Sequence, residues 1–124
     1  MMTQNAVTQA NIDQLRTAQI APQKMLIGSD WRSSQSEAVM EVISPIDGAA
    51  FTSIASGSKA DVDAAVAAAR SSFERGVWRN MPPMARKAVL LKWADLIEAD
   101  TLALTVLGVR DNGTEIGMAE KAEA

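Results

Sequence analysis

The sequence contains no cysteine and no histidine, so neither a thiol nor an imidazole is available for catalysis, and carboxylates are the groups to consider first. Glu98 and Glu115 are the candidates for a general base. A general base must take a proton from a nucleophile or a substrate, and the sequence offers neither an activated nucleophile nor a cofactor for it to act on. The absence of cysteine also excludes disulfides, thiolate metal sites and a cysteine nucleophile within these 124 residues. We therefore predict no catalytic residue in the chain.

The glycines do not form a phosphate-binding loop. Gly108, Gly113 and Gly117 come nearest to a glycine-rich pattern, but they are sparse and follow no predicted strand. A dinucleotide-binding turn needs G-x-G-x-x-G between a strand and a helix, so that the backbone can approach a pyrophosphate. The sequence therefore predicts no cofactor-binding residue.

Three short strands are predicted in the first half of the chain. Residues 25–31, MLIGSDW, contain an apolar strand followed by a Gly-Ser-Asp turn, and residues 39–43 and 51–55 are two further strand candidates. Ser44-Pro45-Ile46-Asp47-Gly48 predicts a tight turn after the second strand. Such short strands cannot form an independent sheet, so we expect them to lie on the first helix or on another chain.

The first amphipathic helix is predicted between Ser58 and Gly76. Ser58 and Asp61 form an S-x-x-D capping box, and Gly76 supplies the left-handed residue that ends a helix. The Ala-rich run at residues 64–69 predicts a close-packing surface. The apolar residues fall on one face of this helix: Val62, Val66, Ala69 and Phe73.

A second helix is predicted to open at Pro82-Pro83, where the first turn has no use for the missing N–H groups. Its apolar run continues to Val109 and stops at residues 111–113. A further helix is predicted from Thr114 to Ala124, where the chain ends without a stop signal. Trp78 and Trp93 could line a ligand pocket, but aromatic residues at helix-stripe spacing are usually core residues. The apolar stripe of the second helix consists of Leu90, Trp93, Ile97 and Leu104.

Composition sets broad limits on location and partners. The sequence is 48% hydrophobic with a net charge of −3, so nothing favours a nucleic acid or an anionic membrane surface as partner. No apolar run reaches membrane-spanning length and no secretory signal is recognisable, which predicts a cytoplasmic protein. Residues 1–24 are rich in Gln, Asn and Thr, and we interpret them as a flexible arm with one or two turns of helix.

The order of these motifs resembles the N-terminal segment of the NAD(P)-dependent aldehyde dehydrogenase superfamily. The shared pattern comprises S-P-x-D-G, then A-D-V-D-A-A-V-A-A-A-R-x-x-F-E, a tryptophan, P-x-x-R-x-x-x-L-x-x-x-A-D-x-I-E and finally D-N-G. Each motif alone is a cap, a turn or an apolar stripe, and their joint order and spacing are what is specific. The resemblance covers about residues 25–124, and Thr114 departs from it by standing where the family commonly has lysine.

The resemblance implies an α+β chain with a short N-terminal β-hairpin or strands and two to three amphipathic helices. Residues 25–124 would be an incomplete portion of an α/β Rossmann-like cofactor domain. Full-length members oxidise aldehydes to carboxylates with NAD or NADP, a catalytic cysteine and a glutamate general base. In the family the cysteine, the glutamate and a glycine-rich cofactor loop all lie C-terminal to this segment, so we expect no NAD or NADP to bind this chain alone.

The resemblance also implies one metal site. Some members bind a monovalent cation with the two residues before the Asn/Ser-Pro pair and with the Asp of the D-x-G turn, which here are Val42, Ile43 and Asp111. Backbone carbonyls and a carboxylate are suitable hard oxygen ligands. The competing interpretation is that Asp111 caps a turn and Ile43 is a strand core residue.

Three hypotheses about function follow. The first is an N-terminal segment of an aldehyde dehydrogenase with a structural role and no activity of its own, for which the missing C-terminal portion or a full-length homologue is the partner and a small aldehyde the substrate of the complete enzyme. The second is a stand-alone protein that pairs exposed apolar stripes with itself or a homologue. The third, an independent enzyme, would need a mechanism without thiol or imidazole.

Overall fold

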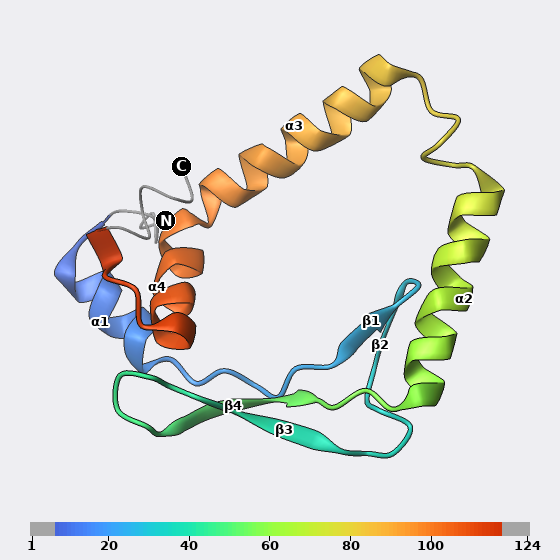
Figure 1. The fold of residues 1–124 in the computed structure, drawn as a ribbon. Coiled ribbons are helices and arrows are strands. Elements are labelled where there is room, and N and C mark those ends of the chain that lie inside the picture. Colours follow the sequence, from blue (N-terminus) through green and yellow to red (C-terminus); the bar gives the residue numbers. More distant parts are fainter. Residues whose placement is uncertain (1–6, 118–124) are drawn as a thin grey trace. The chain divides into compact units, whose positions relative to one another are not determined.

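The computed structural model describes residues 7–117 and divides them into two compact units. One unit contains residues 7–20, 43–51 and 89–117, and the other contains residues 21–42 and 52–88. The described residues form an α+β chain with four helices and two small two-stranded sheets (Figure 1). No helix in this part of the chain is long and apolar enough to cross a membrane.

In the unit of residues 21–42 and 52–88, the segment predicted as strand plus turn is a hairpin. β1 (Met25–Ile27) pairs antiparallel with β2 (Asp30–Arg32), with Leu26 opposite Trp31. Successive strand residues point to opposite faces, so Ile27 is buried at 6% exposure while Leu26 and Trp31 are exposed. β1 packs on α2 (Lys59–Arg75), as expected for a hairpin too small to be stable alone.

α2 begins and ends where the sequence predicts. Ser58 is its N-cap, Asp61 completes the capping box, and Gly76 ends it in the left-handed conformation at φ +71°. A side chain at residue 76 would also collide with the amide group of Asn80. The Ala-rich face approaches the hairpin closely, since a Cβ at Gly28 would lie 3.9 Å from the Cβ of Ala68.

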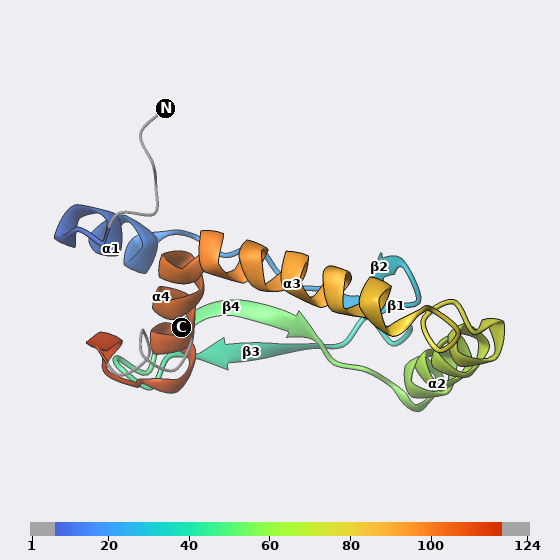
Figure 2. The same cartoon turned by 90° about the horizontal axis from the view of Figure 1, so that it is seen from above.

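β3 (Val39–Ile43) and β4 (Ala50–Ala55) form the second sheet, and their arrows run in opposite directions in Figure 2. The predicted turn joins them, with Ser44 N–H donating to Ala49 O at 2.9 Å. On the other side of β4, Gln23 forms a parallel bridge with Ile54. Its N–H donates to Ser53 O at 2.8 Å, and its carbonyl accepts from Ala55 N at 2.9 Å.

The predicted second helix is two helices, α3 (Pro83–Ala99) and α4 (Thr101–Asn112). Asp100 lies between them at φ −109° and ψ 12°, and Thr101 Oγ1 donates to the carbonyls of Ile97 and Glu98, which disturbs the helical ladder. The prediction of a single stripe through Leu104 is therefore wrong, because Leu104 belongs to α4. Gly113 ends α4 at φ +74°.

α1 (Gln9–Thr17) lies within the segment predicted as an arm and is a fourth helix where two to three were predicted. Thr8 caps its N-terminus with a side chain that accepts from Asn11 N–H at 3.2 Å. α1 packs against α4, and both views show them side by side (Figures 1 and 2). The predicted helix from Thr114 lies mostly outside the described residues, of which 116 and 117 are helical.

The apolar stripes of α2 and α3 are largely uncovered. Trp78 and Trp93 are 45% and 62% exposed, so neither is a core residue among the described residues. The exposure of Trp93 agrees with the hypothesis that the apolar stripes are exposed in this chain. The physical reason is that the described residues place no element over these helix faces, and α3 buries none of its residues. Among the described residues, the buried apolar side chains are Ile27, Leu102 and Val106. The exposed members of the two stripes include Val62, Val66, Phe73, Leu90 and Leu96.

Candidate functional site

Asp61 is the most strongly constrained ionisable group among the described residues. It lies in the first turn of α2 and is 2% exposed. Its Oδ2 accepts hydrogen bonds from Ser58 Oγ at 2.7 Å, Ser58 N at 2.8 Å and Ser34 Oγ at 2.8 Å, and the Gln35 N–H donates to the same carboxylate at 3.2 Å. One carboxylate thus holds the loop after β2 against the start of α2.

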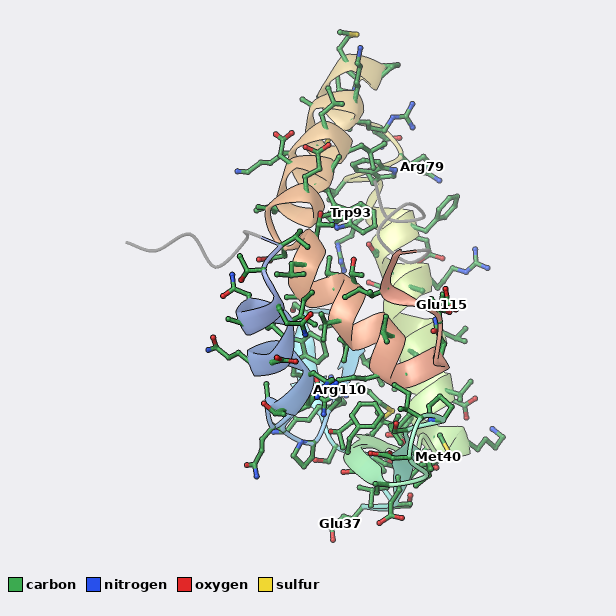
Figure 3. The ribbon with its side chains drawn as sticks, turned by 90° about the vertical axis from the view of Figure 1, so that its left-hand side faces the viewer. Glu37, Met40, Arg79, Trp93, Arg110 and Glu115 are labelled. Atoms are coloured by element: carbon green, nitrogen blue, oxygen red, sulfur yellow. The ribbon has the colours of Figure 1, made fainter. Side chains whose placement is uncertain are left out.

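These donors decide the protonation state of Asp61. The Ser58 hydroxyl, followed by the Ser58 N–H, lowers the pKa of the Asp61 carboxyl from 3.8 to about 2, while burial opposes the shift. A carboxylate with this pKa stays ionised at neutral pH and is a poor proton acceptor. Asp61 is therefore an anchor and not a candidate general base. The same loop holds Glu37 at φ +56°, in the left-handed region, with its side chain directed outward (Figure 3).

In the other unit, Arg110 of α4 joins three segments distant in sequence. Its Nη1 donates to Ala18 O at 2.8 Å and Leu15 O at 3.3 Å, at the C-terminal end of α1 (Figure 3). The guanidinium also lies 4.9 Å from the centroid of the Phe51 ring. Arg110 thus connects α1, α4 and the start of β4.

The turn at residues 44–48 lies at the same end of α4. Asp47 Oδ1 accepts from Ala49 N at 3.1 Å, and Ser44 Oγ accepts from Ile46 N at 3.2 Å. The Ala49 N–H, then the Ser44 hydroxyl, and more weakly the positive charge of Arg110 lower the pKa of the Asp47 carboxyl below 3.8. A Cβ at Gly113 would be 3.1 Å from Pro45 Cγ, so the C-cap of α4 touches this turn.

The residues predicted as cation ligands are now placed on their elements. Val42 and Ile43 are the last two residues of β3, and Asp111 is exposed in the last turn of α4. Through the contact of Pro45 with Gly113, the structure brings the turn that follows Ile43 to the end of the helix that carries Asp111. Within residues 7–117 there is no cluster of three or more His, Cys, Asp or Glu side chains able to hold a metal. The site itself stays a prediction.

The two candidate general bases are both exposed and belong to no enclosed site. Glu98 lies near the end of α3 and Glu115 follows the C-cap of α4. Of the glycines considered for a phosphate-binding loop, Gly113 ends α4 and Gly108 lies inside it. None of these glycines lies between a strand and a helix N-terminus.

A cavity of about 700 Å³ lies between the β1–β2 turn and the small-residue face of α2. Two arginines at its edge already have partners: Arg75 donates to Ser71 Oγ at 2.8 Å, and Arg32 is 3.4 Å from Asp30. The cavity is therefore lined by small side chains and by charged groups that already have partners. Such a lining is typical of a packing surface and not of a catalytic pocket.

Sequence reasoning missed two of the residues that organise these sites. Ser34 and Arg110 both bind partners far away in the chain, by 27 residues for Ser34 and by up to 95 for Arg110. Ser34 had a weak signal, since a serine-rich loop beside a capping acid offers extra donors. Arg110 had none, because its acceptors are backbone carbonyls, which every residue carries.

Comparisons with known proteins add to this geometry. A model described as the aldehyde dehydrogenase family matches residues 31–124. Phenylacetaldehyde dehydrogenase of Pseudomonas fluorescens is 40% identical over 92 residues, which are 74% of this chain and 18% of that protein. The chain spans about a fifth of the length of the curated relatives it matches, since it covers 18%, 20% and 19% of three of them.

Solved structures show the same likeness. The γ-glutamyl-γ-aminobutyraldehyde dehydrogenase of Burkholderia cenocepacia superposes with a TM-score of 0.83 at 36% identity, over 92% of this chain and 23% of that one. The indole-3-acetaldehyde dehydrogenase AldA of P. syringae, solved in complex with NAD+, gives a TM-score of 0.85 at 30% identity, over 93% and 23% of the two chains.

Proposed function

Because the chain belongs to the aldehyde dehydrogenase family, we propose that its residues form the N-terminal supporting part of an NAD(P)-dependent enzyme that oxidises aldehydes to carboxylates. In this role they take no part in bond breaking. Residues 25–124 contribute a hairpin and helices that flank a Rossmann-like cofactor domain, and residues 1–24 are an arm. The proposed cellular location of the enzyme is the cytoplasm.

The observation that carries the proposal is the uncovered apolar surface. Val62, Val66 and Phe73 on α2 and Leu90 and Trp93 on α3 are all at least half exposed, although their spacing is that of core-facing helix stripes. Stripes of this kind are stable when another layer covers them. In the proposed enzyme, that layer consists of the segments that bind the cofactor and carry the catalytic residues.

The cofactor's phosphates do not fit the strand-to-helix junction in this chain. That junction is β4 to α2, and dinucleotide folds hold the pyrophosphate on free amides at the N-terminus of such a helix. Here the ionised carboxylate of Asp61 accepts from the Ser58 N–H at 2.8 Å and repels a second anion. We therefore assign the binding of NAD or NADP to a different portion of the proposed enzyme.

The proposal is tested by complementation. The purified chain is mixed with a phenylacetaldehyde dehydrogenase from which the matching segment has been deleted, and NADH formation from phenylacetaldehyde is followed. The mixture should be active and each component alone inactive. Leu90→Asp should abolish the gain by charging the apolar stripe, whereas Lys92→Asp, on the opposite side of α3, should preserve it. Activity of the chain alone would contradict the structural role.

The same exposed surface favours one alternative, a stand-alone protein that associates with itself or with a full-length homologue. Sedimentation distinguishes the two ideas when it is run on the complementation samples. Defined oligomers of the chain without any restored activity would support the alternative. A dilute, folded monomer that restores activity would exclude it.

The predicted cation site is a further proposal for the turn at residues 44–48 and the end of α4. Its support is the contact of Pro45 with the C-cap residue Gly113, which a site shared by Ile43 and Asp111 requires. The ligands would be the carbonyls of Val42 and Ile43 and the carboxylate of Asp111. Its role would be to fasten the turn to α4.

A further inference from the structure

The C-terminal end of α1 is held from outside the helix. The last carbonyls of a helix lack intrahelical partners and carry partial negative charge, so they favour a cation. Arg110 donates to Ala18 O at 2.8 Å and to Leu15 O at 3.3 Å, across 92 and 95 residues of sequence, and Leu15 O also accepts from the Ala18 N–H at 3.3 Å. The guanidinium therefore caps α1 from α4.

The contacts inside α1 are local and exposed: the Thr8 N-cap, a hydrogen bond of 3.0 Å from Gln9 to the Asp13 carboxylate, and one of 2.9 Å from the Thr17 hydroxyl to Asp13 O. Exposed local contacts of this kind stabilise a helix only weakly. The helix has nine residues, and isolated helices shorter than roughly 12–15 residues are marginal in water. None of its residues is buried, and its apolar residues Ile12 and Leu15 are half-buried. The stability of α1 thus depends on packing against α4 and on Arg110.

Arg110 is held in position from its other side. Its guanidinium lies 4.9 Å from the centroid of the Phe51 ring, and its positive charge helps to lower the pKa of Asp47 in the β3–β4 turn. A guanidinium fixed in this way loses less side-chain freedom when it donates to α1. Its Nη1 carries two hydrogens and donates to both carbonyls. The fastening point therefore belongs to α4 and the turn, and α1 is the element that can leave.

We propose that α1 is a detachable strap on α4, fastened by Arg110, and that its release uncovers the apolar face of α4 formed by Leu102 and Val106. These side chains are 7% and 4% exposed, and α1 is the helix that packs along α4. The inference does not depend on the dehydrogenase role.

Amide hydrogen exchange on the full 124-residue chain tests the fastening. Arg110→Leu should accelerate exchange of residues 9–17 by about tenfold or more and leave residues 59–75 of α2 unchanged. Arg110→Lys should give a smaller increase, because lysine keeps the positive charge but lacks the planar guanidinium that lies beside the Phe51 ring. The matched control is Arg79→Leu, which removes a similar contact, a guanidinium 4.6 Å from the Phe73 centroid, without touching α1.

A single introduced cysteine tests the uncovering, since the chain has no other thiol. In a Val106→Cys background, Arg110→Leu should raise the rate of thiol labelling by about the same factor as the exchange of α1. Moderate salt should accelerate both readouts in the chain that keeps Arg110 and have little effect after Arg110→Leu. The proposal is overturned if α1 exchanges like a free peptide before any substitution, if α2 exchange rises as much as α1 exchange, or if labelling at residue 106 does not change.

Discussion

Replacing Ser58 by alanine perturbs the best-defined polar arrangement of the chain. The Ser58 hydroxyl accepts from the Asp61 N–H at 3.3 Å and donates to Asp61 Oδ2 at 2.7 Å. Ser58→Ala removes both hydrogen bonds and leaves the backbone N–H of residue 58, Ser34 and Gln35 as donors to the carboxylate. The start of α2 and the protonation of Asp61 should therefore change together.

The expected loss of stability is about 1 kcal/mol, because Ser→Ala at an N-cap costs roughly 0.5–2 kcal/mol and the capping bond here is long. The pKa of Asp61 should rise from about 2 toward 3.8, since the Ser58 hydroxyl is the largest cause of its lowering. A carboxyl whose folded pKa is depressed stabilises the protein above its unfolded pKa and loses that contribution as the pH falls through the folded value. The stability that the protein loses as the pH falls from 3.8 to about 2 should therefore be smaller in Ser58→Ala than in the unsubstituted chain.

Urea unfolding followed by far-UV circular dichroism measures the first effect, and NMR titration of the Asp61 carboxyl carbon measures the second. Ser72→Ala is the matched control, because Ser72 is exposed inside the same helix, where alanine is slightly favourable. The reasoning is refuted if Ser58→Ala leaves the unfolding midpoint unchanged, or if the pKa of Asp61 stays at about 2 without the hydroxyl.

Two further predictions concern packing and the cation site. Ile27→Ala should destabilise the β1–α2 packing by about 2 kcal/mol, the low end for a buried aliphatic residue, whereas Leu26→Ala on the exposed face of the same strand should stay within about 0.5 kcal/mol in the same urea assay. Equal effects would contradict the assigned strand faces. Replacing choline by potassium should raise the melting temperature of the chain, and Asp111→Ala but not Asp95→Ala should remove the increase. No potassium effect in the unsubstituted chain would reject the site.

Local signals in the sequence predicted most of the secondary structure. Ser58, Asp61 and Gly76 define α2 because caps act on backbone groups within a few residues. The turn between β3 and β4 was predictable for the same reason, since proline, aspartate and glycine restrict their own backbone. The family was recognisable from the order and spacing of these motifs, and the match to residues 31–124 confirms it.

Where local signals conflicted, the sequence misled. The apolar run from Leu90 to Val109 predicted one helix, although Asp100 and the hydroxyl of Thr101 interrupt it. The apolar spacing of α3 indicates which residues share a helix face, but it does not indicate whether another element covers that face. Trp93 is on such a stripe and is exposed.

Local chemistry in the sequence therefore determines the caps, turns and helix faces of this protein, because each depends on residues that are neighbours in the chain. The tertiary structure alone decides which of those groups meet. Ser34 reaches Asp61 and Arg110 reaches the end of α1 through acceptors tens of residues away, and those acceptors include backbone carbonyls identical in every residue. Long-range partners of that kind leave no mark on residue spacing, so they appear only once the chain is folded.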